Sequence, residues 1–326
     1  MSLRSLLKQM QPKVLQILEN SYKHNRLSHA YLFAGAKGTL KKKMAYHFAL
    51  MLYCKHEEVC YECDTCRQIL NNNHLNVFYI EPTGQNIKKE QILALQEEFS
   101  KTSQIEGPRI YIINHADKMS TQAANSLLKF IEEPTSEETY GILITEQKDS
   151  ILPTIISRSI ILNFDMPKKT EVKRLLLDSG LDEKIVDVLT YITNNEDEAK
   201  VMVLEDEFND LNNLFNKFIL QLSTNAPIGL FYRANANVLN NKKTLLSFLN
   251  LIEGFYRDTY EFIVSEKVLH FTTYLEEIKA FSAYVNANDV LESLKLILEL
   301  RKKLGYNVNT SLLINQLLIN LRGGKI

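Results

Sequence analysis

The sequence predicts an α/β core followed by an all-α region. Five short apolar runs alternate with helical patterns over residues 1–165. Strand signals nearly vanish after Met166-Pro167, and long amphipathic patterns follow. A frame resembling a phosphate-binding loop comes directly after the first apolar run. Because strands that alternate with helices build parallel sheets, we expect a five-stranded parallel sheet and then helical domains.

The expected strands are bounded by turn residues, and helical spacing fills the segments between them. The strands are expected at residues 31–34, 77–80, 110–113, 142–145 and 160–164. A helix is expected at 41–53. Ile92, Leu95 and Phe99 follow the spacing of another helix, and a third helix through Leu127 is expected to stop at Pro134.

The second half of the chain divides into two helical regions. Short helices are expected over residues 166–207, and longer ones over 208–326, which gives three domains with the core at 1–165. Three apolar stripes in the last region are expected to face a core. The stripes are Leu211, Leu214, Phe215, Phe218 and Leu222; Leu245, Phe248, Leu249, Ile252 and Tyr256; and Leu291, Leu294, Ile297 and Leu298.

Composition excludes several classes of protein. The 326 residues are 45% hydrophobic and 24% charged, as in ordinary globular proteins. The net charge of −1 means that any contact with nucleic acid must be local. The first residues lack the apolar core of a signal peptide, and no apolar run approaches the roughly 20 residues of a membrane span. We therefore expect a cytoplasmic protein without a membrane partner.

The phosphate-loop frame departs from its pattern at two positions. Gly35-Ala36-Lys37-Gly38-Thr39-Leu40-Lys41-Lys42 aligns with G-x-x-x-x-G-K-[ST]. Gly35 and Lys41 fit. Leu40 replaces the glycine that admits phosphate, and Lys42 replaces the hydroxyl that binds magnesium. Lys41 could lie on a solvated basic face, bind phosphate or nucleotide weakly, or contact a DNA backbone.

A second part of a nucleotide-hydrolysis site is also missing. The strand ending at Ile113 should deliver a carboxylate for magnesium and a partner that orients water. It delivers Asn114-His115, which we expect to be structural polar residues. Ser157-Arg158-Ser159 nevertheless retains a possible arginine donor. The combination predicts a subunit that no longer hydrolyses ATP but can help a neighbour to do so.

All four cysteines lie between positions 54 and 66. Two consecutive C-x2-C steps join Cys60, Cys63 and Cys66, and Cys54 lies upstream. In a cytoplasmic chain such clustering favours a metal over disulfides, and four thiolates close the shell of a structural zinc ion. We predict these four as zinc ligands. His56 in place of Cys54, and four free thiols without a metal, remain open.

Several segments together resemble a known family. They are Leu27-Ser28-His29-Ala30-Tyr31-Leu32-Phe33, the cysteine cluster, Ala116-Asp117-Lys118-Met119, Asn125-Ser126-Leu127-Leu128-Lys129-Phe130-Ile131-Glu132-Glu133-Pro134 and Ser157-Arg158-Ser159. The chain resembles the delta prime subunits of bacterial DNA polymerase III clamp loaders, which are AAA+ proteins. The resemblance is strong over the first half and holds in outline over the second.

The resemblance implies a fold, a set of partners and a role. The fold is an AAA+ core with a zinc-binding insertion at 1–165, a helical lid at 166–207 and a helical collar for oligomerisation at 208–326. The partners are motor subunits of the gamma/tau type and a delta subunit; the sliding clamp and primed DNA are reached through the complex. In the family, the arginine of a Ser-Arg-Cys segment completes a neighbour's ATP site. Arg158 has this position here, with Ser159 in place of the cysteine.

We therefore expect a clamp-loader subunit that carries zinc and binds ATP weakly or not at all at Lys41. Two alternatives stay open: an active ATP-hydrolysing motor subunit with an irregular loop, and a zinc-dependent nucleic-acid-binding module on an inert scaffold. ATP hydrolysis that is lost on Lys41→Ala would favour the first. DNA binding that is abolished by Cys63→Ser would favour the second, although the near-neutral charge speaks against it.

Overall fold

The computed structural model describes residues 2–101, 103, 105–132, 136, 138–226, 228, 230–304, 314, 317, 318 and 321. The chain forms two compact units, residues 1–168 and 169–326. The division into three domains, with boundaries after residues 165 and 207, stays a prediction. Glu133 and Pro134, where the third expected helix should stop, lie outside the described residues.

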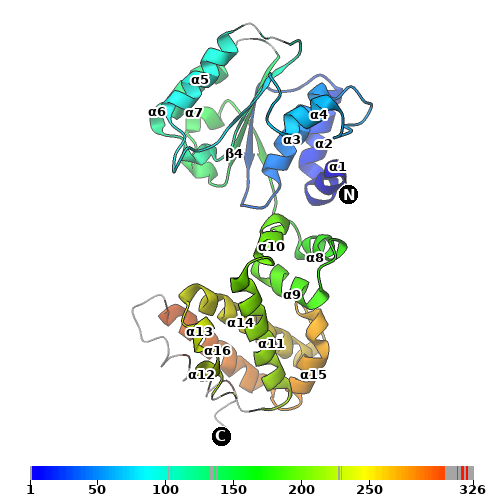
Figure 1. Cartoon of the computed structure of the whole chain (residues 1–326), viewed down its shortest axis with the longest axis vertical. Helices are drawn as coiled ribbons and strands as arrows, with labels where there is room; N and C mark the ends of the chain where they lie inside the picture. The colour runs from blue at the N-terminus through cyan, green and yellow to red at the C-terminus, as the bar shows by residue number, and fades with distance from the viewer. Residues whose placement is uncertain are drawn as a thin grey trace. The chain divides into compact units, whose positions relative to one another are not determined.

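A parallel sheet of five strands forms the centre of the first unit (Figure 1). The strands are β1 (Ala30–Ala34), β2 (Val77–Ile80), β3 (Arg109–Ile113), β4 (Thr139–Thr145) and β5 (Ile160–Asn163). Their order is β2-β3-β4-β1-β5, and Leu32 at the middle of β1 pairs with Leu143 and Ile161. The expected α/β core with its five-stranded parallel sheet is confirmed.

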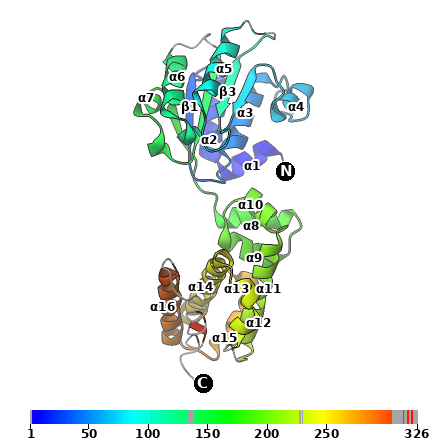
Figure 2. The ribbon, with the colours of Figure 1, turned by 60° about the vertical axis from the view of Figure 1, so that its left-hand side comes forward.

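Helices cover both faces of this sheet, with α1–α4 on one face and α5–α7 on the other (Figures 1 and 2). Tyr31 and Phe33 of β1 pack with the first group, whereas Ala30 and Leu32 pack with the second. Burial on both faces explains why the strands read as nearly continuous apolar runs. The helices are α1 (Leu3–Met10), α2 (Pro12–Lys23), α3 (Lys41–Tyr53), α4 (Asp64–Leu70), α5 (Lys89–Ser100), α6 (Thr121–Glu132) and α7 (Pro153–Ile156), with 3-10 turns η1 (Ala116–Lys118) and η2 (Lys148–Ser150).

The second unit is helical in all its described elements. The residues of the apolar stripes expected on α11 and α14 are all buried, which confirms that these stripes face a core. The elements are α8 (Lys169–Asp178), α9 (Glu183–Ile192), α10 (Glu196–Met202), α11 (Asp206–Ser223), α12 (Phe231–Ala234), α13 (Ala236–Leu239), α14 (Lys242–Ser265), η3 (Thr272–Tyr274), α15 (Leu275–Ser282) and α16 (Ala287–Lys303).

The third expected stripe, on α16, is only partly right. Leu291 and Leu298 are 36% and 40% exposed. The buried face instead consists of Val290, Ser293, Ile297 and Leu300. Ser293 occupies a core position because its hydroxyl lies 2.9 Å from the carbonyl oxygen of Asp289 and 3.1 Å from that of Leu321. The buried face of α16 therefore includes a polar residue whose hydroxyl has internal partners, and it differs from the face that apolar periodicity predicts.

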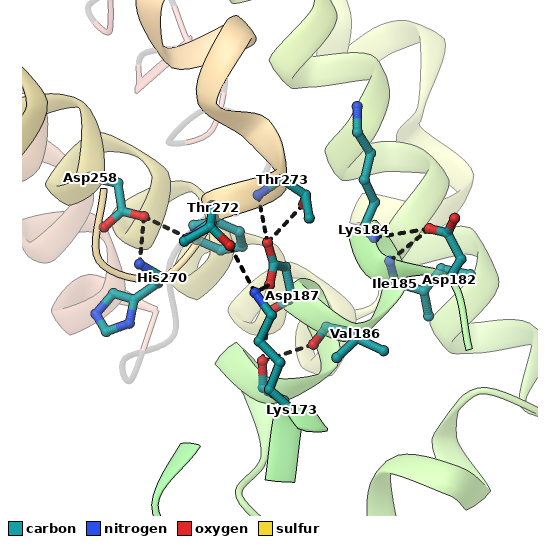
Figure 3. Close-up of polar contacts among 12 residues, drawn as sticks. Lys173, Asp182, Lys184, Ile185, Val186, Asp187, Asp258, His270, Thr272 and Thr273 are labelled. Carbon is teal, nitrogen blue, oxygen red and sulfur yellow. Dashed lines mark hydrogen bonds and ion pairs between the residues drawn. The ribbon is translucent and has the colours of Figure 1, made fainter. Parts of the chain in front are cut away.

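A buried carboxylate on α14 holds the segment that precedes η3 (Figure 3). Asp258 is fully buried and accepts hydrogen bonds from three consecutive backbone N–H groups. The donors are Leu269 at 3.2 Å, His270 at 2.9 Å and Phe271 at 2.7 Å. These bonds satisfy backbone donors that a buried loop would otherwise leave unpaired.

A second buried carboxylate, on α9, binds the start of η3 (Figure 3). Oδ2 of Asp187 accepts hydrogen bonds from the N–H and the hydroxyl of Thr273, at 2.9 and 2.7 Å. Its Oδ1 pairs with Lys173, whose ammonium also donates to Thr272 at 2.8 Å. Asp187 thus ties the short helices α8 and α9 to the segment that leads into α15.

We predict that Asp187→Ala destabilises the protein by about 3–5 kcal/mol, because it leaves the Lys173 charge and the Thr273 donors without their acceptor. The matched control is Glu276→Ala, since Glu276 is 82% exposed in its pair with Lys279 and such pairs contribute about 1 kcal/mol or less. Urea unfolding of the full chain measures both. Equal losses in the two variants would contradict the structural role of Asp187.

Candidate functional site

The phosphate-loop frame connects the carboxyl end of β1 to the first turn of α3. Leu40, directly before α3, has the left-handed backbone at φ 64° that a glycine normally adopts in such a loop. Gly35 has a packing role, because a Cβ added there would lie 2.5 Å from the carbonyl oxygen of Phe164. The loop therefore keeps its backbone path although one of the expected glycines is absent.

The ammonium group of Lys41 binds the loop's own oxygens. Its Nζ atom donates to the carbonyl oxygens of Gly35 and Ala36, both at 2.6 Å, and to Oγ1 of Thr39 at 3.2 Å. A lysine ammonium has three N–H donors, so these contacts engage all of them. Only 6% of Lys41 is exposed. Of the three alternatives left open for Lys41, the solvated basic face is therefore wrong, because the ammonium closes the loop from inside.

Two residues that sequence reasoning missed hold this closed loop. Nε2 of Gln11 donates to the carbonyl oxygens of Thr39 at 3.1 Å and of Asp165 at 2.7 Å. The hydroxyl of Thr39 donates to the carbonyl of Ala36 at 2.9 Å. Gln11 lies 28 residues before Thr39, and no local pattern in the sequence identifies such a distant contact.

Nearby carboxylates partly offset the effect of burial on the pKa of Lys41. Burial lowers the pKa of Lys41, and the carboxylates of Glu146 and Asp117 raise it in part. Asp117 accepts from the Thr145 hydroxyl at 2.9 Å and from the Glu146 N–H at 3.2 Å. In the sequence, Asp117 was indicated only by its place in the Ala116-Asp117-Lys118-Met119 segment that carries part of the resemblance.

Lys42 and Asn114-His115 also differ from the residues that a nucleotide-hydrolysis site requires. Lys42, at the magnesium-hydroxyl position, places its ammonium 4.4 Å from the centre of the Tyr79 ring. Asn114 donates its backbone N–H to Ile80 at 2.8 Å, and His115 has a left-handed backbone at φ 55°. The β3 end therefore offers an amide and an imidazole where magnesium would need a carboxylate.

Arg158 follows α7 and lies beside α6. Its Nη2 atom is 2.7 Å from Oε1 of Glu132, and its Nη1 donates to the carbonyl of Thr154 at 3.2 Å and to Oγ of Ser157 at 3.5 Å. The side chain is 42% exposed. It can therefore meet an external anion while its own chain holds one side of the guanidinium.

The structure brings the four cysteines and His56 together. Sγ of Cys60 is 3.7 Å from Sγ of Cys54 and 3.8 Å from Sγ of Cys66. The donor atoms of Cys54, His56, Cys60 and Cys63 all lie within 4.8 Å of one another. Four sulfurs at about 2.3 Å from a tetrahedral zinc ion are separated by about 3.8 Å, so the donor set fits zinc. Which four donors bind stays a prediction.

The environment of the thiols differs from one to the next. Backbone N–H groups of Glu62 and Cys63 lower the pKa of the Cys60 thiol to about 6. Burial raises the pKa of the Cys66 thiol, which is fully buried at the start of α4. His56 is exposed and receives a contact of 3.6 Å from Sγ of Cys54. A metal would replace the protons of its thiol ligands, including that of Cys66.

The cysteine loop is anchored to the core by Tyr61 and Arg4. The Tyr61 hydroxyl is 2.7 Å from Nδ1 of His47, and burial lowers the pKa of His47 to about 4, so the imidazole is neutral at pH 7. Arg4 contacts Glu58 in the loop at 3.0 Å and Glu19 in α2 at 2.8 Å. The loop is thus attached to α1, α2 and α3, and a metal in it would brace this side of the core.

Several known proteins similar to this chain are subunits of DNA polymerase III or are related to them. A model of the family described as DNA polymerase III, delta subunit matches residues 10–168. DNA polymerase III subunit delta' of Bacillus subtilis (strain 168) is 35% identical over 321 residues, which cover 97% of each chain. DNA polymerase III subunit tau of the same organism is 34% identical over 151 residues, 45% of this chain and 26% of tau. A solved DNA polymerase III gamma subunit-related protein from Thermotoga maritima aligns over 94% of this chain and 98% of its own, with 16% identity and a TM-score of 0.42.

The parallel α/β core, the phosphate-loop frame between β1 and α3, and the helical unit that follows define an α/β protein of the phosphate-loop type with a helical second unit. Within that class, the identity over nearly the full length of both chains shows that this chain belongs to the family of DNA polymerase III delta' subunits. The resemblance noted in the sequence is confirmed. In the described part of the chain, no helix has the length and apolar character that crossing a bilayer requires.

We predict one zinc ion per chain, held by Cys54, Cys60, Cys63 and Cys66. Cys66→Ser should lower the affinity for zinc by more than about 100-fold, a larger loss than contacts outside the ligand shell cause. His56→Ala is the matched control and should keep its zinc. Metal content after dialysis against a chelator measures both. Zinc retained by Cys66→Ser but lost from His56→Ala would contradict this ligand set.

Proposed function

We propose that this chain is a clamp-loader subunit that does not hydrolyse ATP itself and that supplies Arg158 to the ATP site of a neighbouring subunit. In this role it helps to load the sliding clamp on primed DNA during replication. Its partners would be motor subunits of the gamma/tau type and a delta subunit. Membership of the delta' family supports the assignment to this complex.

The contact of Lys41 with Gly35 and Ala36 is the observation that carries the first half of this proposal. A triphosphate could engage Lys41 only by displacing two carbonyl oxygens from a buried ammonium. Leaving a buried polar group without a partner costs about 1–3 kcal/mol. The carbonyl oxygens of Gly35 and Ala36 would be left in this state when the Lys41 ammonium turned to a phosphate. Nucleotide binding at this loop would therefore be weak or absent.

The absence of magnesium ligands supports the same conclusion. Lys42 stands where a hydroxyl would bind the metal, and Asn114 stands where a carboxylate would. Magnesium neutralises the charge that develops on the transferred phosphoryl group, so a site without its ligands loses much of the catalytic power of such enzymes. The chain would act as a fixed member of the ring and not as a motor.

The second half of the proposal rests on the position of Arg158. Its guanidinium is planar, permanently charged and partly exposed, which suits bidentate contact with a phosphate of another subunit. Such an arginine stabilises the charge on the γ-phosphate in the transition state. Ser159 in place of the family's cysteine leaves this charge unchanged.

The zinc site and the helical regions have supporting roles in this proposal. Four thiolates would close the metal shell and leave no open position for chemistry, so the zinc would be structural. Residues 166–207 would form the lid, and residues 208–326 the collar that joins the subunits of the ring. The exposed apolar residues Leu220 and Leu298 are available for contacts of the collar with other subunits.

We predict that the purified chain does not turn over ATP with magnesium and that Lys41→Ala leaves the ATPase of the assembled complex within about twofold of the wild type. The same change should lower the stability of the chain by about 1–3 kcal/mol, because the loop oxygens lose their donor. A coupled ATPase assay and urea unfolding measure the two effects. Magnesium-dependent turnover by the isolated chain, lost in Lys41→Ala, would identify an active motor subunit instead.

We also predict that Arg158→Ala lowers the DNA-stimulated ATPase of the complex at the site it serves by at least about tenfold, because arginine fingers contribute about 10^3-fold or more. The ring should assemble normally, as size-exclusion chromatography would show. Arg174→Ala is the control, since Arg174 is an exposed arginine on α8. Unchanged ATPase and clamp loading in Arg158→Ala would overturn the finger role. DNA binding by the isolated chain that depends on Cys63 would instead favour a zinc-dependent nucleic-acid module.

A further inference from the structure

We propose that Glu132 is a positioning residue for Arg158: it holds one side of the guanidinium so that the opposite edge is presented to the neighbour's phosphate. This inference rests on the proposed function of Arg158. Oε1 of Glu132 lies 2.7 Å from Nη2 of Arg158, so the two side chains form a close ion pair. Glu132 therefore acts through Arg158 and does not itself touch the nucleotide.

The pattern of contacts leaves a usable edge on the guanidinium. Arginine has five N–H donors: two on Nη1, two on Nη2 and one on Nε. Thr154 and Ser157 accept hydrogen bonds from Nη1, and the Glu132 carboxylate forms an ion pair with Nη2. Among the residues that the structure describes, no contact engages Nε. The Nε–H therefore remains available, on its edge of the planar guanidinium, to donate to a phosphate oxygen of the neighbouring subunit.

The scaffold beneath the pair is rigid. Ile131 precedes Glu132 on α6, and Ile155 lies on α7 just before Arg158. Both are buried in the same apolar cluster on one face of the sheet. Glu132 is the last residue of α6 and Arg158 lies in the turn directly after α7, and the two helices pack in the same cluster. An arginine fixed in this way loses less rotamer freedom when it meets its target than one that is free to rotate.

The place of Glu132 in α6 indicates that it serves Arg158 and not the helix. A carboxylate in the last turn lies at the negative end of the helix dipole, where it disfavours the helix. The guanidinium offsets this unfavourable placement. Both side chains are about 40% exposed, at 42% for Arg158 and 39% for Glu132. An exposed pair of this kind is weak, so it orients Arg158 without preventing the side chain from reaching a phosphate.

The test uses the full complex, reconstituted with the motor subunits and DNA. Glu132→Ala should lower the ATPase turnover number by about two- to fivefold and leave KM for ATP unchanged, because the loss is one of orientation in the transition state. Glu132→Gln should lose less, since its amide oxygen still accepts one hydrogen bond. Glu98→Ala is the matched control, because Glu98 forms an exposed pair with Lys101 in the same unit and should have no effect.

A double-mutant cycle separates this inference from the proposed function. In a chain that already carries Arg158→Ala, adding Glu132→Ala should cause no further loss. If Arg158→Ala lowers the ATPase but Glu132→Ala does not, or lowers it equally with and without Arg158, the positioning role is wrong and the finger role stands. If Arg158→Ala has no effect, the finger role itself fails. Unchanged melting temperature and ring assembly in each variant exclude a folding defect.

Discussion

The bond between the Lys41 ammonium and the carbonyl oxygens of Gly35 and Ala36 is the contact on which the account of this protein depends. In a phosphate loop that binds nucleotide, the lysine ammonium contacts the phosphates of the ligand. Here all three of its donors are turned inward, and Gln11 fastens the loop from the other side. Because these groups of the loop already have hydrogen-bond partners within the chain, contacts with a nucleotide would add little binding free energy. The same bonds make the loop a rigid joint between β1 and α3.

Other charged residues near the phosphate-loop frame also make internal contacts. Lys42 lies over the Tyr79 ring, and Asp117 accepts hydrogen bonds from the end of β4. Arg158, in contrast, has a guanidinium that is 42% exposed and that pairs with Glu132. Lys42 and Asp117 therefore make internal contacts, whereas part of the Arg158 guanidinium is exposed. Buried aspartates such as Asp258 supply comparable rigidity in the helical unit.

Much of the fold could be predicted from the sequence, because strands buried on both faces leave continuous apolar runs and the long helices leave stripes such as Leu211 to Leu222. The positions of Lys41, Arg158 and the cysteines were also visible, since each lies in a local motif. What could not be predicted came from distant or polar partners. Gln11 and Glu132 act across the fold, and Ser293 takes a core position that apolar periodicity assigns to the surface.

The most direct test of the central claim is a calorimetric titration of the purified chain with ATP and magnesium. If Lys41 is held by its own loop, no saturable binding should appear up to about 1 mM nucleotide, which corresponds to a free energy of binding weaker than about −4 kcal/mol. Micromolar binding that disappears in Lys41→Ala would contradict the account, because it would mean that the ammonium leaves its carbonyl partners for phosphate.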